Sequence, residues 1–158
     1  MKPESQAKTP GRLKAGFVAE PDARCSQFYF RPQSQMKDSR ILVIEDDPSV
    51  RDAIARMLRS RGFEVIEAEN GEKGIDLAST ANPALILSDI QMPEMDGFAV
   101  LDQLQKDPET ANIPFILMTG WADGSKVASQ LKRGVRVLQK PFGIETLMNS
   151  VLAHLNEP

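Results

Sequence analysis

An apolar run that ends in an acid lies near the middle of the chain, at residues 85–97, LILSDIQMPEMDG. Residues 85–87 carry no charge and show no alternation, which is typical of a parallel strand buried on both faces. Pro93 and Gly97 mark a loop after this run, so Asp89 is expected at the carboxyl end of a central strand. Open α/β sheets bind their ligands at that edge.

Four further apolar runs have the length of a strand, at residues 41–44 (ILVI), 63–68 (FEVIEA), 115–118 (FILM) and 135–138 (VRVL). Helical spacing of apolar residues predicts five helices, over residues 48–62, 72–80, 98–107, 125–133 and 144–155. Asp47 before Pro48, and Asp96 before Gly97, suit the caps of two of these helices. Strands that alternate with helices predict an α/β fold, a doubly wound parallel five-stranded sheet covered on both faces.

The 158 residues suit one domain with a tail, and the net charge of −3 gives no electrostatic reason to expect nucleic acid binding. The single cysteine, Cys25, cannot form an internal disulfide, and the single histidine, His154, cannot form a cluster of histidine ligands. The apolar run at residues 15–19 is too short for a signal peptide or a membrane span. We therefore expect a cytoplasmic protein without a zinc site and without membrane contact.

Residues 1–38 show no sustained hydrophobic period, because prolines and glycines interrupt every candidate element. We interpret them as a flexible N-terminal tail with one apolar patch at residues 28–30 (FYF), and residues 39–158 as the folded domain. Met36, just before the first strand, is an alternative start for a protein without the tail. The tail has a net charge of +3 and the domain one of −6.

Polar residues follow four of the predicted strands, and they would meet at one edge of a parallel sheet. The residues are Glu45 and Asp46 after the first strand, Asp89 after the third, Thr119 after the fourth and Lys140 after the fifth. Three converging carboxylates repel one another, and a divalent cation removes that repulsion. Oxygen ligands suit Mg²⁺, while a hydroxyl and an ammonium suit a phosphoryl group. We interpret this edge as a phosphoryl pocket with Asp89 as its nucleophile.

Four motifs stand in order along the domain: residues 41–48 (ILVIEDDP), 89–97 (DIQMPEMDG), 118–120 (MTG) and 140–142 (KPF). With these motifs, residues 40–155 resemble the receiver domain of a bacterial two-component response regulator. The resemblance implies a flavodoxin-like fold with strand order 2-1-3-4-5. Because only three residues follow residue 155 in this sequence, we expect a stand-alone receiver over residues 39–158.

The resemblance also implies roles for the acids. Asp89 would accept a phosphoryl group from the phosphohistidine of a sensor histidine kinase or a histidine phosphotransfer protein. Mg²⁺ would be held by Asp46, Asp89 and the backbone carbonyl of Gln91, with Glu45 acting through water. Such a domain catalyses its own phosphoryl transfer and slow dephosphorylation, and it is not a turnover enzyme.

Two further residues, Thr119 and Lys140, would contact the phosphoryl oxygens, and the Lys140–Pro141 bond would be cis.

One departure from the family pattern concerns Val137, because the family usually carries an aromatic switch residue three positions before the lysine. Without that ring, we expect a monomer or weak dimer that signals through a protein partner. Trp121 and Gln91 each lie two places after a site residue, where the family tunes the access of water to the acyl phosphate. The alternative for Trp121 is a partly exposed aromatic residue in a loop.

Other classes of protein fit this sequence less well. A flavin-binding flavodoxin would need hydroxyls and glycines where residues 45–47 (EDD) would repel a phosphate. An Asp-nucleophile phosphatase would carry a DxD pattern after its first strand, and a DNA-binding regulator would need a helix-turn-helix segment. The alternative that remains is a receiver-like scaffold or interaction module that works without phosphorylation.

Overall fold

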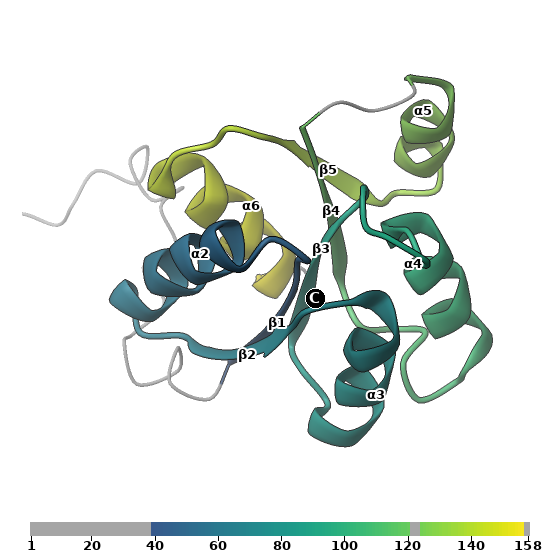
Figure 1. The fold of residues 1–158 in the computed structure, drawn as a ribbon, viewed down its shortest axis with the longest axis horizontal. Helices are drawn as coiled ribbons and strands as arrows, with labels where there is room; N and C mark the ends of the chain where they lie inside the picture. Colours follow the sequence, from purple (N-terminus) through teal and green to yellow (C-terminus); the bar gives the residue numbers. More distant parts are fainter. Residues whose placement is uncertain (1–38, 121–123, 157–158) are drawn as a thin grey trace, which may run out of the picture. The chain divides into compact units, whose positions relative to one another are not determined.

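The computed structural model describes residues 39–120 and 124–156, in which strands and helices alternate (Figure 1). The strands are β1 (Arg40–Ile44), β2 (Glu64–Ala68), β3 (Leu85–Asp89), β4 (Phe115–Thr119) and β5 (Arg136–Gln139). The helices are α2 (Pro48–Ser60), α3 (Gly71–Ala81), α4 (Gly97–Lys106), α5 (Gly124–Lys132) and α6 (Ile144–Leu155). None of these helices could span a membrane.

The five strands form one parallel sheet in the order β2-β1-β3-β4-β5, which confirms the predicted fold class. Their register aligns the carboxyl ends, because Ile44 pairs with Ser88, Asp89 with Met118, and Thr119 with Gln139. The polar residues that follow the strands are therefore delivered to one edge of the sheet. The observed strand ends differ from the predicted ones by one or two residues.

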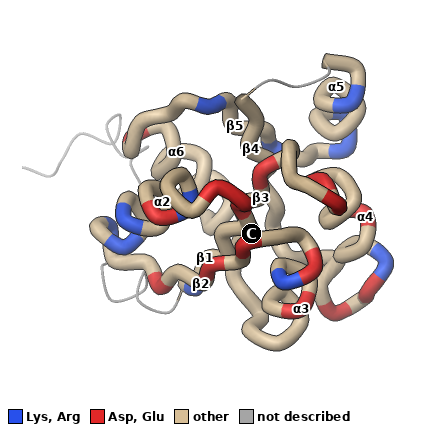
Figure 2. Tube along the Cα trace, viewed as in Figure 1, with Lys and Arg blue, Asp and Glu red and all other residues tan. Residues whose placement is uncertain are grey.

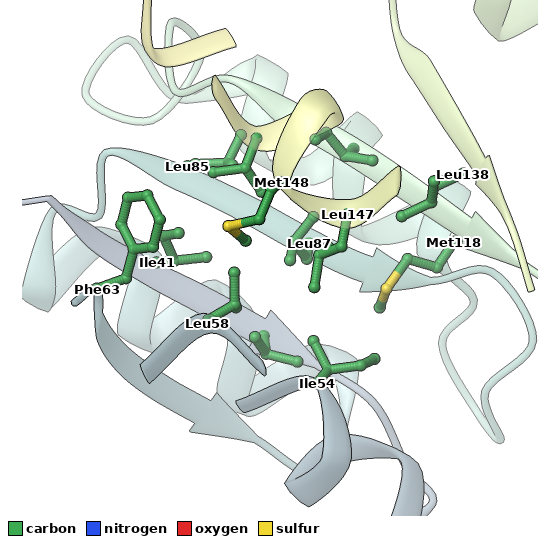
Figure 3. Packing of buried hydrophobic residues seen from close by; sticks show 13 residues of the cluster. Ile41, Ile54, Leu58, Phe63, Leu85, Leu87, Met118, Leu138, Leu147 and Met148 are labelled. Carbon is green, nitrogen blue, oxygen red and sulfur yellow. The ribbon is translucent and has the colours of Figure 1, made fainter. Parts of the chain in front are cut away.

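Alternate strand residues face opposite sides of the sheet and so build two cores. One core lies against α2 and α6 (Figure 3), and its residues include Ile41, Val43, Ile54, Leu58, Leu85, Leu87, Leu147 and Met148. The other lies against α3 and α4, and its residues include Leu42, Ile44, Ala78, Ile86, Val100, Leu101, Leu104 and Leu117. Both β3 and β4 are buried along their whole length, and each begins with the continuous apolar run that is typical of a central parallel strand.

The helix that follows each acidic loop begins with a side-chain cap. The Asp47 carboxylate accepts hydrogen bonds from the Ser49 and Val50 backbone N–H groups at 2.8 and 3.2 Å, and Pro48 occupies the first helical position. The Asp96 carboxylate accepts a hydrogen bond from the Ala99 N–H group at 2.8 Å. Both predicted caps are thus confirmed, and each fixes where its helix starts relative to the neighbouring strand end.

Gly97 brings the first residue of α4 into contact with the end of β3. Its N–H group donates a hydrogen bond to the Ile90 carbonyl at 3.0 Å. A Cβ atom at this position would lie only 2.3 Å from the backbone oxygen of Asp89. No side chain fits there without moving the main chain of one element or the other.

We predict that Gly97→Ala lowers the free energy of unfolding by about 1–3 kcal/mol, because the added methyl group overlaps the backbone of Asp89. Gly124→Ala is the matched control, since Gly124 also begins a helix but has open space where its Cβ would lie. Its effect should stay within about 0.5 kcal/mol. Urea unfolding measures both variants, and equal stability of the two would show that the close contact at Gly97 is unimportant.

Candidate functional site

Three carboxylates gather at the carboxyl edge of the sheet. Glu45 and Asp46 follow β1, and Asp89 is the last residue of β3, so the neighbouring positions of β1 and β3 bring them together. One carboxylate oxygen from each lies within 4.8 Å of the others. Glu45 and Asp89 are buried, whereas Asp46 is exposed. Figure 2 shows acidic segments in red between α2 and β3.

Lys140, which follows β5, places its ammonium group between two of these acids. Its Nζ atom lies 2.6 Å from Glu45 Oε2 and 3.0 Å from Asp89 Oδ1. The backbone N–H group of Lys140 also donates to the Thr119 carbonyl at 2.7 Å, which holds the lysine at the end of β4. The Lys140–Pro141 peptide bond is cis, as predicted.

The buried groups of this cluster have shifted pKa values. Burial raises the pKa of Asp89, the bond from Lys140 opposes that shift, and the charge of Asp46 adds to it. Burial likewise raises the pKa of Glu45 despite its bond from Lys140. For Lys140, burial alone would lower the pKa, but the hydrogen bonds to Glu45 and Asp89 raise it above its ordinary value. Even with one ammonium group between them, the charged forms of the two carboxylates are therefore disfavoured by burial and by repulsion from the neighbouring acids.

Thr119, the last residue of β4, contributes a buried hydroxyl group to the same edge. The residue is 6% exposed, and its Oγ1 atom has no hydrogen-bond partner among the described residues. A buried hydroxyl without a partner is costly, and an oxygen-rich ligand at the strand ends would satisfy it. Thr119 also lines a hollow of about 420 Å³ together with Val127 and Val137.

The donor set fits a hard divalent cation. Every candidate ligand atom is an oxygen. Two of the three acids have raised pKa values, and added positive charge would stabilise their charged forms. Gln91 lies two residues beyond the end of β3, and its side chain is exposed. Trp121 lies outside the described residues.

Arg51 joins this site and was missed in the sequence analysis. Its Nη1 atom donates a hydrogen bond to the backbone carbonyl of Glu45 at 2.7 Å. The one indication of this contact in the sequence was the predicted cap at Asp47. A residue one helical turn after that cap points back toward the acidic loop. Such a contact between a side chain and a backbone carbonyl leaves no motif of its own.

We predict that Asp89→Asn raises the free energy of unfolding at pH 7 in the absence of Mg²⁺. Because the pKa of Asp89 is raised in the folded state, its stabilising contribution is complete below the ordinary value of 3.8 and is lost as pH rises through the folded value. The asparagine variant removes this loss, while Lys140 keeps its bond to Glu45. Urea unfolding from pH 4 to 7 measures it, with the exposed Asp76→Asn as control. Lower stability of Asp89→Asn at pH 7 would contradict the assignment.

A family model described as the response regulator receiver domain matches residues 41–152. Protein PilH of Pseudomonas aeruginosa is 37% identical over 118 residues, which cover 74% of this chain and 98% of PilH. The DNA-binding dual master transcriptional regulator RpaA of Synechocystis is 36% identical over 117 residues, which cover 73% of this chain. The match spans only 48% of RpaA, about half of that protein.

Solved structures agree with this comparison. The chemotaxis protein CheY4 of Vibrio cholerae superposes with a TM-score of 0.68 at 27% identity, over 73% of this chain and 97% of CheY4. The receiver domain of a histidine kinase from Syntrophus aciditrophicus gives a TM-score of 0.67 at 32% identity, over 74% and 89% of the two chains. The family model, the relatives and the solved structures agree, and the chain belongs to the response regulator receiver domain family of two-component systems.

Proposed function

We propose that this receiver domain accepts a phosphoryl group on Asp89, with Mg²⁺ bound by the neighbouring acids, and passes its state to a protein partner. The observation that carries the proposal is the placement of a buried Asp89 beside Lys140 and within reach of Glu45 and Asp46. The orphaned hydroxyl of Thr119 at the same edge supports it. Bound Mg²⁺ would supply positive charge to the carboxylates and to the phosphoryl oxygens.

The proposed reaction uses the residues of this chain as follows. A carboxylate oxygen of Asp89 attacks the phosphorus, the N–P bond of the donor phosphohistidine breaks, and the imidazole leaves with its electron pair. Lys140 would exchange its bond to Asp89 for one to a phosphoryl oxygen, and the Thr119 hydroxyl group would donate a hydrogen bond to another. Asp46, Asp89 and the Gln91 carbonyl are the proposed metal ligands, and Glu45 would act through water.

The proposed phosphoryl donor is a sensor histidine kinase or a histidine phosphotransfer protein, and the output is contact with a downstream protein. Residues 39–158 are proposed to contain the whole receiver unit, with residues 1–38 as a separate tail. Val137 is small and half-buried, and so has no ring to rotate when Thr119 moves. For this reason we propose a monomer or weak dimer rather than dimerisation driven by a ring on β5.

Phosphorylation is expected at one residue. With Mg²⁺ and acetyl phosphate, intact-protein mass spectrometry should show one added phosphoryl group, and Asp89→Asn should abolish it because the nucleophilic oxygen is gone. Asp96→Asn is the matched control, since Asp96 lies in the same loop but caps α4. Equal labelling of wild type and Asp89→Asn would refute the acceptor assignment.

Metal binding is expected to depend on Asp46. Asp46→Ala should weaken Mg²⁺ binding by at least about tenfold in calorimetry, because it removes one of the oxygen ligands. Asp47→Ala, at the next position, should cost about 1 kcal/mol of stability through the lost helix cap and leave the affinity unchanged. Unchanged affinity in Asp46→Ala would place the ion elsewhere.

The tail is expected to be dispensable. A chain that starts at Met36 should melt at nearly the same temperature as the full chain and accept phosphate at the same rate, because residues 1–35 have no periodic apolar pattern. Differential scanning calorimetry and the labelling assay measure both. A large fall in melting temperature would instead mean that residues 28–30 pack against the domain.

A further inference from the structure

Arg51, in the first turn of α2, is tied to the acidic loop by both its side chain and its main chain. The guanidinium group donates to the Glu45 carbonyl at 2.7 Å, and the backbone N–H group donates to the Asp47 carbonyl at 2.9 Å. The side chain is only 17% exposed, and its Nε atom also lies 3.6 Å from Glu67 Oε2 on β2. The arginine therefore connects the loop, the helix and the neighbouring strand.

Further contacts hold the peptide units on both sides of Glu45. The N–H group of Glu45 donates to the Ala68 carbonyl on β2 at 3.1 Å, while its C=O group accepts from Arg51. With both polar groups of Glu45 held, the direction in which the chain enters Asp46 is set. Within residues 39–120 and 124–156, no hydrogen bond is made to the Asp46 carboxylate itself. Its orientation toward Asp89 therefore depends on the main chain.

We propose that Arg51 is a positioning residue for the cation site. It acts through the Glu45 carbonyl and holds the Glu45–Asp46 peptide so that the Asp46 carboxylate lies beside Asp89. The inference rests on the proposed function, in which these acids bind Mg²⁺. Residues that orient the ligands of a metal contribute to its affinity without touching it. Loss of the guanidinium would also leave the Glu45 carbonyl without this partner.

The structure offers a matched control in Arg59. This residue also lies on α2 and pairs with the same Glu67, at 2.8 Å, but its other hydrogen bond goes to the Val65 carbonyl on β2. Its side-chain contacts in the described part of the chain do not include Glu45. Arg59→Gln thus removes a comparable ion pair on Glu67 and leaves the acidic loop held by Arg51.

The test is Mg²⁺ calorimetry on the full chain, with melting temperature measured in parallel. Arg51→Gln should bind Mg²⁺ about tenfold more weakly than wild type, whereas Arg59→Gln should bind with wild-type affinity although both lose a bond to Glu67. Arg51→Lys keeps a cation and a donor but loses the planar fork, so its affinity should lie between those of wild type and Arg51→Gln. This ranking is one that a purely structural role would not produce.

Three results would overturn the role of Arg51 and leave the proposed function intact. They are wild-type Mg²⁺ affinity in Arg51→Gln, an equal loss of affinity in Arg59→Gln, or an affinity of Arg51→Lys no higher than that of Arg51→Gln. Should Arg51→Gln fail to fold, wild-type affinity in Arg51→Lys would overturn it. Absence of Mg²⁺ binding in the wild-type chain would overturn the proposed function instead, together with the role that rests on it.

Discussion

The ammonium group of Lys140 between Glu45 and Asp89 is the interaction on which the carboxyl edge of this sheet depends. Two buried carboxylates on adjacent strands would be costly without a nearby cation. Lys140 is 95 residues from Glu45 in sequence and reaches it only because β1, β3, β4 and β5 are neighbours in that order. The arrangement thus requires these four strands, and it brings together residues that follow the first and the last strand of the fold.

The two cores explain how strand ends become so closely placed. Along β3 and β4, successive side chains point to opposite faces of the sheet, and both faces are buried. These two strands therefore have little freedom to change their register. Caps at Asp47 and Asp96 then fix the starts of α2 and α4 beside the same edge. The accurate placement of the polar residues at this edge therefore results from apolar packing in the two cores, together with a small number of backbone hydrogen bonds.

Much of this could be predicted from the sequence, because continuous apolar runs such as residues 115–118 identify buried parallel strands and parallel strands share one edge. The placement of Glu45, Asp89 and Lys140 at one edge follows from those two facts, and the strand order that makes them neighbours was implied by the resemblance to receiver domains. The roles given to these residues as phosphoacceptor, metal ligands and phosphoryl contact stay predictions.

The direct bonding of Lys140 to both acids could not be predicted, because it is settled by side-chain distances and not by residue spacing. Arg51 was missed for another reason: its partner is a main-chain carbonyl, and every residue has one. The contact of Gly97 with Asp89 was equally hidden, since a glycine after Asp96 is already explained by a loop. Interactions with backbone atoms are thus the part of the site that sequence patterns do not reveal.

Gly97 has a consequence for the tolerance of this site to change. A contact made by side chains can adapt to a mutation, because the side chains rotate into new rotamers. At Gly97 the start of α4 packs main chain on main chain against Asp89, and neither partner can rotate away. The spacing between the end of β3 and the start of α4 is therefore independent of side-chain motion. Substitutions elsewhere in the loop between them can change its side chains, while glycine at position 97 preserves this close backbone contact.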